Sequence, residues 1–216
     1  TSRKVDECQR VADAICADGG KALAMGCHIG DMRQISETFS NLKDKFGRLD
    51  ILVNNAATNT FFGHVLETDL GAFQKTVDVN IRGYFFMSVE AAKMMKAQGG
   101  GVICNTASIS GVKPGSGQGI YSITKAAVIN MTKTFAKECG PMGIRCNALL
   151  PGLTETKFAS ALTTDEKLLE RVNTNLPLRR AAQPCEMAGA VLYLCSDAAS
   201  YTTGECLIVD GGSLIA

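Results

Sequence analysis

The chain has 216 residues, of which 46 % are hydrophobic and 20 % are charged, and its net charge is +1. This length suits one domain with a buried core, so we expect a single domain over residues 1–216. A nearly neutral chain lacks the strongly basic surface that nucleic acids and anionic membranes require. No apolar run has the length of a membrane span, and the first ten residues do not resemble a signal peptide. We therefore expect small-molecule partners, with no nucleic acid and no membrane.

Short apolar runs alternate with amphipathic stretches of helical length, which is typical of βαβ units around a parallel sheet. Hydrophobic periodicity, glycine and proline set the expected boundaries. In chain order we expect a helix that ends at Gly19-Gly20, a strand over 22–25, a helix over 32–46, a strand over 50–53, a helix over 69–98, a strand over 102–105, a helix over 119–139, a strand over 145–150, a helix over 184–195 and a strand over 206–209. The fold class is therefore α/β, a Rossmann-like doubly wound parallel sheet in three α/β/α layers.

The chain starts on a predicted helix, with no strand before it. A doubly wound sheet normally opens with a strand and a glycine-rich turn that binds pyrophosphate. Gly19-Gly20 ends a helix, and the glycines over 111–119 do not follow the G-x-G-x-x-G pattern. We therefore expect the sequence to be incomplete at its N-terminus, lacking a first βαβ unit of roughly thirty or more residues.

Nine cysteines are scattered along the chain without a C-x-x-C pair, and only two histidines accompany them. Most lie in apolar stretches, where a free cysteine behaves as a small hydrophobic residue. Such a composition offers few ligands for a zinc site, so we expect no metal. We expect reduced core cysteines in a cytoplasmic protein, with redox sensing as the open alternative.

A tyrosine and a lysine stand four residues apart in the predicted helix over 119–139, so their side chains share one face. A phenol has a pKa of ~10, and a neighbouring ammonium lowers such a pKa by about 1–3 units. Tyr121 and Lys125 are thus a candidate acid/base pair, although this spacing alone more often marks a solvated helix face. Ser108 lies thirteen residues before Tyr121 and follows a predicted strand, at the end of a parallel sheet where ligands bind.

Two further features fit the same kind of site. The run Asn-Asn-Ala-Ala at 54–57 follows another buried strand, and Asn80 lies inside the predicted helix over 69–98. By itself, a helical asparagine usually bonds to nearby backbone. Pro151-Gly152, after the strand over 145–150, is equally well explained as turn chemistry.

Together these residues resemble the short-chain dehydrogenase/reductase family, and the resemblance covers essentially the whole chain. It rests on the N-N-A-G-like run at 54–57, the helical Asn80, the Ser–Tyr–Lys set, the P-G-x-x-x-T run at 151–156 and the closing Ile-Val-Asp-Gly-Gly at 208–212. The last glycine of N-N-A-G is Ala57 here. The resemblance implies an enzyme that passes hydride between a nicotinamide cofactor and a carbonyl or alcohol.

The resemblance also implies roles for four residues. Tyr121 would be the general acid in reduction and the base in oxidation. Lys125 would lower the pKa of Tyr121 and bind the nicotinamide ribose. Ser108 would hold the substrate oxygen as charge develops on it. Asn80 would tie a water into a proton relay through the ribose and Lys125.

Cofactor contacts are implied position by position, and the expected set is Ser2, Arg3, Ile29, Asn55, Ala56, Tyr121, Lys125, Pro151, Gly152, Thr154 and Thr156. In the family, an acidic residue after the second strand selects NAD, whereas Ser, Arg or Lys selects the 2′-phosphate of NADP. The run Thr-Ser-Arg-Lys at 1–4 holds no acid, so we favour NADP(H) over NAD(H). His28 stands where the family often has an Asp that contacts adenine; an ordinary surface-loop histidine is an equally good interpretation.

We expect residues 153–180 to form a substrate lid. Its apolar residues could cover a substrate or simply pack on the body: Phe158, Leu162, Leu168 and Val172. Phe61 and Phe62 are further pocket candidates. The resemblance also implies a homo-oligomer, a dimer or tetramer that pairs the helices over 69–98 and 119–139.

An NADP(H)-dependent carbonyl reductase or alcohol dehydrogenase is the leading hypothesis. A 3-oxoacyl-thioester reductase of the same family is the runner-up, because the lid sequence does not distinguish them. A non-catalytic dinucleotide-binding sensor or scaffold is the alternative from a different class, although the presence of both Tyr121 and Lys125 disfavours it. The residues do not identify the physiological substrate.

Overall fold

The computed structural model describes residues 1–156, 158 and 174–216. Within them, a parallel sheet has the strand order β1-β2-β3-β4. The strands are β1 (Ile51–Asn54), β2 (Gly101–Thr106), β3 (Ile144–Pro151) and β4 (Cys206–Val209). All four expected strands from residue 50 onward are therefore confirmed, and their carboxyl ends meet at one edge of the sheet.

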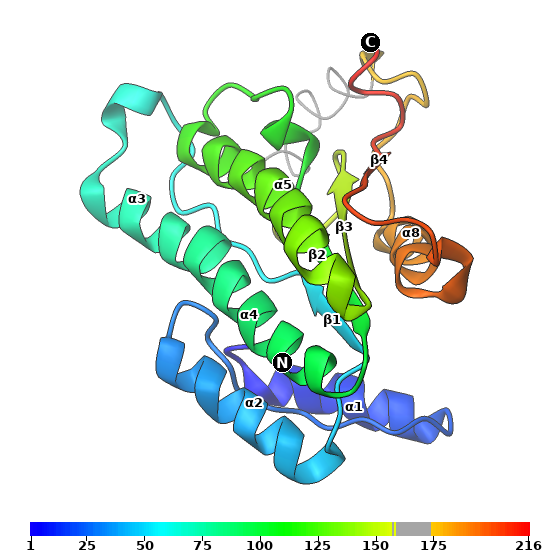
Figure 1. Ribbon diagram of the computed structural model, residues 1–216. Helices are drawn as coiled ribbons and strands as arrows, with labels where there is room; N and C mark the ends of the chain where they lie inside the picture. The colour runs from blue at the N-terminus through cyan, green and yellow to red at the C-terminus, as the bar shows by residue number, and fades with distance from the viewer. Residues whose placement is uncertain (157, 159–173) are drawn as a thin grey trace.

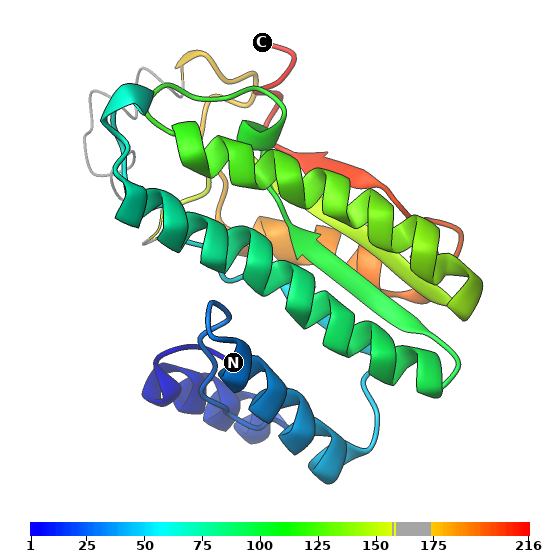
Figure 2. The ribbon, with the colours of Figure 1, turned by 60° about the vertical axis from the view of Figure 1, so that its left-hand side comes forward.

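Helices cover both faces of this sheet. Figure 2 shows α4 (Tyr84–Ala97) and α5 (Gly119–Cys139) on one face and α8 (Pro184–Cys195) on the other. The N-terminal helices α1 (Val5–Ala17) and α2 (Met32–Phe46) lie at the bottom of Figure 1, on the β1 side of the sheet, and α2 contacts α4. This is the expected three-layer α/β/α arrangement.

The second helix shows how local chemistry sets an element's bounds. The Asp31 carboxylate accepts from the backbone N–H groups of Arg33 and Gln34, which satisfies donors that the first turn leaves unpaired. Ile35 and Phe39 stand four residues apart on α2 and are both buried, so one apolar stripe faces the core. The helix ends before Gly47, as the sequence predicts.

The helical stretch expected over 69–98 is interrupted by a wider turn. It consists of α3 (Leu70–Val77), the π-helical segment η2 (Asp78–Gly83) and α4. A Cβ on Gly83 would lie 2.6 Å from the carbonyl oxygen of Ile29, so this position has room for glycine only. Single π turns inside helices often occur at functional sites, and this one contains the fully buried Asn80.

The strand expected over 22–25 is wrong. Residues 22–25 have no strand structure, and the next residue makes one isolated parallel bridge, between Ser2 and Gly26. A β-strand forms only where a neighbouring strand accepts and donates hydrogen bonds along its length. No described strand runs beside this segment.

The cysteines are all free, but they are not all in the core. Cys27, Cys104 and Cys146 are buried, as expected. Cys16 and Cys185 are exposed, which contradicts the expectation for these two residues.

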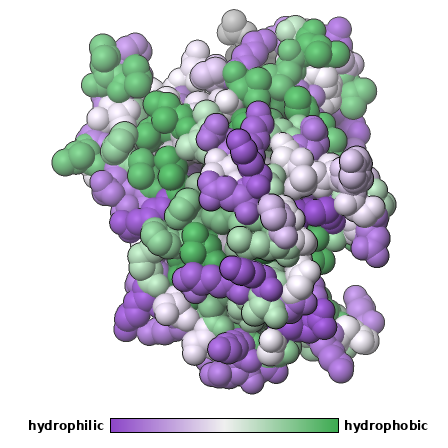
Figure 3. Space-filling model, viewed as in Figure 1, coloured by the Kyte–Doolittle hydropathy of each residue, from purple (hydrophilic) through white to green (hydrophobic). Residues whose placement is uncertain are grey.

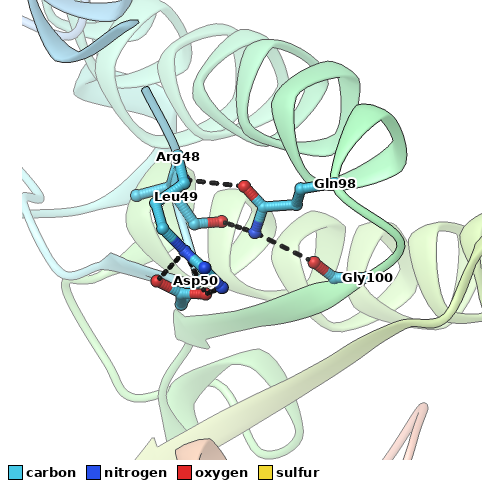
Figure 4. A network of polar contacts seen from close by, with 5 residues as sticks. All are labelled: Arg48, Leu49, Asp50, Gln98 and Gly100. Carbon is cyan, nitrogen blue, oxygen red and sulfur yellow. Dashed lines mark hydrogen bonds and ion pairs between the residues drawn. The ribbon is translucent and has the colours of Figure 1, made fainter. Parts of the chain in front are cut away.

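The edge of the sheet opposite the carboxyl ends is held by a polar network (Figure 4). The Gln98 amide accepts from the Leu49 N–H at 3.0 Å and donates to the carbonyls of Leu49 and Gly100 at 2.8 and 3.2 Å. Arg48 and Asp50 form an ion pair next to it. The side chain of Gln98, just after α4, thus holds the segments that lead into β1 and β2.

Among the described residues, no helix is long and apolar enough to cross a membrane.

Candidate active site

Tyr121 and Lys125 lie in the first two turns of α5, and both side chains are buried. Their exposed fractions are 8 % and 1 %. The Lys125 Nζ is 5.6 Å from the centroid of the Tyr121 ring. The pair shares one helix face, as the spacing predicts, and burial rules out a solvated face.

Ser108 reaches the same place from the end of β2. It precedes the short helix η3 (Ile109–Gly111), and its Oγ accepts from the Ser110 N–H at 3.1 Å. The Ser108 hydroxyl lies near enough to the Tyr121 phenol to lower its pKa. The structure therefore brings together the serine, tyrosine and lysine that the sequence singles out.

Burial dominates the electrostatics of this pair. It raises the pKa of Tyr121 to about 12, and the hydrogen bond from Ser108 lowers that pKa in part. Burial also lowers the pKa of Lys125 to about 7. Lys125 directs its Nζ at the Thr106 carbonyl, 2.6 Å away, and burial has the largest effect on the pKa of Tyr121. Tyr121 is thus a protonated phenol at neutral pH, which suits a proton donor.

Sequence reasoning missed two residues that hold Lys125. The Thr106 carbonyl accepts from Lys125 Nζ and from the Tyr84 hydroxyl. The Tyr84 ring lies 5.3 Å from Nζ, within cation–π range. Thr106 ends a strand that precedes Ser108, so its position was a usable signal; Tyr84 offered none, because apolar packing explains a helical tyrosine equally well.

Asn80 joins three segments. Its Oδ1 accepts from the Thr58 N–H at 2.9 Å, and its Nδ2 donates to the Thr58 carbonyl at 2.9 Å and to the Thr124 hydroxyl at 3.0 Å. Both amide donors are therefore in use, and the side chain connects the segment after β1 to α5 beside Lys125.

The two asparagines at the end of β1 differ in environment. Asn54 is buried and donates to Ser88 Oγ at 3.0 Å and to Asn105 Oδ1 at 2.9 Å. Asn55 is exposed, and its Oδ1 accepts from the Thr106 hydroxyl at 3.1 Å. Ala56, next in the chain, is exposed as well. Asn54 thus supports the sheet, whereas Asn55 and Ala56 face outward at its carboxyl edge.

The Pro151-Gly152 turn lies at the same edge, at the end of β3. The Gly152 N–H donates to the Val209 carbonyl at 2.9 Å, which fixes the turn against β4. The Thr154 hydroxyl donates to the Gly152 carbonyl at 3.1 Å, and the Thr156 hydroxyl to the Thr154 carbonyl at 3.5 Å. These threonines therefore stabilise the turn locally.

Three expected cofactor residues lie in the N-terminal part. Ser2 and Arg3 precede α1, which lies far from the start of α5 in both views (Figures 1 and 2). Arg3 is exposed. Ile29 is buried, and its carbonyl packs on Gly83. Ile29 thus approaches the segment that holds Asn80, whereas Ser2 and Arg3 do not reach the Ser108–Tyr121 pair.

His28 makes a local contact. Its Nδ1 accepts from the Gly30 N–H at 2.9 Å, and this bond favours the ordinary loop histidine over a ligand contact. In the described part of the chain, no group of three or more His, Cys, Asp or Glu residues is placed to hold a metal ion.

Aromatic residues border Tyr121. The Phe158 ring lies 5.7 Å from the Tyr121 ring, tilted by 43°, so this residue of the expected lid does contact the site. Leu162, Leu168 and Val172 lie outside the described residues. The Gly63 N–H donates to the Gly117 carbonyl at 3.0 Å, which brings the segment of Phe61 and Phe62 beside the start of α5.

Known proteins match this chain over almost its whole length. A family model described as "Enoyl-(Acyl carrier protein) reductase" matches residues 1–213. "Dehydrogenase/reductase SDR family member 4" of Oryctolagus cuniculus is 36 % identical over 99 % of this chain and 82 % of its own length.

Solved structures are similar over nearly all of the chain. A short-chain type dehydrogenase/reductase from Mycobacterium marinum has a TM-score of 0.93 at 36 % identity, covering 100 % of this chain and 85 % of its own. A gluconate 5-dehydrogenase from Burkholderia cenocepacia, in complex with NADP and tartrate, has a TM-score of 0.95 at 28 % identity, with 99 % and 84 % covered.

Proposed function

This chain belongs to the short-chain dehydrogenase/reductase family, and from that premise we propose that it transfers hydride between NADP(H) and a carbonyl or secondary alcohol. The observation that carries the proposal is that Ser108 acts on the phenol of the buried Tyr121, one helical turn from the buried Lys125. A phenol, a hydroxyl and an ammonium that converge in this way can hold an oxygen and exchange its proton.

The proton chemistry falls to Tyr121. In reduction, its phenol donates a proton to the substrate oxygen; in oxidation, its phenolate takes that proton back. With substrate bound, Ser108 directs its single hydroxyl proton to the same oxygen instead of to Tyr121 and stabilises the charge that develops there. A bound nicotinamide would supply or accept the hydride. Lys125 stabilises the phenolate form in oxidation when it carries its charge.

The hydrogen-bond donors and exposed residues at the carboxyl edge of the sheet are suited to bind a dinucleotide. Lys125 has three N–H donors and uses one on Thr106, so two remain for ribose hydroxyls. We assign the adenosine side to Ile29, Asn55 and Ala56, and the nicotinamide side to the turn over 151–156 with Pro151, Gly152, Thr154 and Thr156. Asn80 holds Thr58 and Thr124 in place around this edge.

The preference for NADP(H) rests on Ser2 and Arg3. An exposed guanidinium binds a phosphate through two parallel hydrogen bonds, and no acid stands over residues 1–4 to repel it. The Burkholderia relative, whose structure contains NADP, supports the same choice.

Activity tests the proposal directly. We expect the purified protein to consume NADPH faster than NADH with at least one member of a panel of ketones, aldehydes, sugar acids and a 3-oxoacyl thioester. Tyr121→Phe should lower the rate by about 10² or more, since general acid catalysis contributes that much. Tyr201→Phe, at a fully exposed tyrosine, is the matched control.

The other possible outcomes of this assay distinguish between the alternative functions. Turnover of the thioester alone would favour the 3-oxoacyl-thioester reductase. Tight binding of a dinucleotide without turnover of any substrate would favour the sensor or scaffold. Full activity of Tyr121→Phe would contradict the acid/base role.

We assign a homo-oligomer to this chain, paired through α4 and α5. Phe85 and Phe86 of α4 are each partly exposed and stack edge-to-face, and Phe85 also packs on Phe135 of α5. Apolar side chains also gather over η1 (Val65–Glu67) and the start of α3 at the upper left of Figure 3, where Leu66 and Leu70 are exposed. Light scattering should give a dimer or tetramer, and Phe86→Glu should shift it towards the monomer.

The free cysteines support a reducing compartment such as the cytoplasm. All nine are unpaired, whereas proteins of oxidising compartments commonly form disulfides. Fractionation of the cells that make the protein tests this assignment.

A further inference from the structure

The hydroxyl of Ser108 is held by the backbone of a neighbouring serine. Its Oγ accepts from the Ser110 N–H at 3.1 Å, in the first turn of η3. This bond occupies one lone pair of Oγ and limits the rotamers of the side chain. The direction in which Ser108 offers its proton therefore depends on where Ser110 lies.

Ser110 is in turn joined to α5 by its side chain. The Ser110 hydroxyl donates to Gln118 Oε1 at 2.9 Å. Gln118 is the residue that precedes α5, and its carbonyl accepts from the Ser122 N–H at 2.8 Å, so it is part of the first turn of that helix. Tyr121 lies in the same turn. The Ser110–Gln118 bond thus connects the turn that holds Ser108 to the helical turn that holds Tyr121.

The segment between these two residues does not provide such a connection. Residues 112–116 are exposed and include Gly115, so the chain path from Ser110 to Gln118 is a solvated loop. Behind the loop, η3 packs directly on α5: a Cβ on Gly111 would lie 2.7 Å from the Lys125 backbone carbon. This contact sets how closely η3 approaches α5. The Ser110–Gln118 bond is a further contact between η3 and the start of α5, and it is made by side chains.

We propose that Ser110 and Gln118 are positioning residues, which hold the Ser108 hydroxyl and the Tyr121 phenol at the separation that proton transfer requires. The proposal deepens the proposed function and rests on it. Neither residue is assigned a contact with the reacting atoms; both act through the positions of Ser108 and Tyr121. Misplacement of reacting groups by 1 Å can lower a rate by about 10²-fold. Loss of the Ser110–Gln118 hydrogen bond should therefore lower the rate measurably.

Steady-state kinetics of a double-mutant cycle is the first test. We expect Ser110→Ala and Gln118→Leu each to lower kcat by about 5- to 20-fold with KM changed less than about twofold, and the double variant to be no worse than either single one, because both remove the same bond. Ser110→Thr keeps the hydroxyl and should retain most of the rate. Ser116→Ala, in the same exposed loop, is the matched control. Wild-type kcat in Ser110→Ala, or independent additive losses, would overturn the proposal.

A spectroscopic test does not depend on turnover. The chain has four tyrosines, so ¹³Cζ-tyrosine NMR gives few resonances, and Tyr121→Phe identifies the one of interest. We expect Ser110→Ala to move the Tyr121 resonance towards its position in Ser108→Ala, with no shift in Ser110→Thr or Ser116→Ala. A resonance that moves in Ser108→Ala but stays in Ser110→Ala would refute the positioning role. If the wild-type protein reduced no carbonyl, the proposed function would fail while this spectrum still decided the proposal.

Discussion

Lys125 and Tyr84 share one acceptor. The ammonium and the phenol both donate to the Thr106 carbonyl, at 2.6 and 3.3 Å, and the ammonium lies 5.3 Å from the centroid of the Tyr84 ring. Tyr84 is fully buried, and burial raises its pKa above the ordinary value for a phenol. The neutral Tyr84 ring thus lies against the Lys125 ammonium, and both side chains donate to the same carbonyl.

Removal of the Tyr84 hydroxyl tests this arrangement. Tyr84→Phe keeps the ring beneath Lys125 and leaves the Thr106 carbonyl to the ammonium, so we expect a loss of only about 0.5–1.5 kcal/mol in the free energy of unfolding, with activity retained. Tyr84→Ala should cost about 3–5 kcal/mol, because it opens a cavity in the core. Urea titration measures both. Equal losses for the two variants would show that the ring does not support the site.

The buried Lys125 predicts a pH dependence of stability. Its pKa falls from 10.5 to about 7 on folding, because burial disfavours the charge. Between these values the unfolded chain binds more protons, so the contribution of Lys125 to stability rises with pH over this window and is least favourable below pH 7.

Lys125→Met removes this effect while keeping most of the volume. We expect the variant to gain most in melting temperature over the wild type near pH 6, and the difference to shrink towards pH 10, because each pKa unit corresponds to about 1.4 kcal/mol. Melting curves across this range measure it. A difference that is independent of pH would contradict the buried, shifted lysine.

The pKa of Tyr121 predicts opposite pH profiles for the two reaction directions. Below a pKa of about 12 the phenolate fraction grows about tenfold per pH unit, so oxidation of an alcohol should accelerate from pH 7 to 10, whereas reduction, which needs the phenol, should stay level. Initial rates in both directions measure this. Reduction that declines steeply above pH 7 would place the acid at another group.

Asn80 should matter for stability as well as for rate. Asn80→Ala removes the partner of three hydrogen bonds, at the N–H and carbonyl of the half-buried Thr58 and at the buried Thr124 hydroxyl. We expect a loss of about 2–4 kcal/mol, because unpaired buried polar groups carry their full desolvation penalty. Chemical denaturation measures this loss. Asn80→Asp keeps Oδ1 and should restore only the hydrogen bond from the Thr58 N–H.

Arg3 should discriminate between the two dinucleotides. Arg3→Ala is expected to raise the KM for NADPH about 10- to 100-fold and to leave the KM for NADH unchanged, because a charge-assisted bond to the 2′-phosphate contributes about 1.5–3 kcal/mol. Arg10→Ala, at an exposed arginine of α1, is the control for general charge effects. Equal changes for both cofactors would remove Arg3 from phosphate recognition.

The amino-acid sequence by itself determined the layered α/β fold and the members of the site. Helical periodicity places Tyr121 and Lys125 on one face whatever surrounds them, and alternation of apolar runs with helices favours a parallel sheet. These are short-range properties of the chain. The strand expected over 22–25 failed because a strand also needs a neighbour, which the segment's own residues do not reveal.

Only the tertiary structure decided how these residues are held. Lys125 finds its acceptor at Thr106, 19 residues away, and Asn80 finds Thr58 and Thr124 at separations of 22 and 44 residues. The pKa of Tyr121 rises because the fold buries it, whereas the local pattern predicted the reverse. Desolvation and hydrogen-bond partners depend on which distant segments pack around a side chain, and spacing along the chain does not encode that packing.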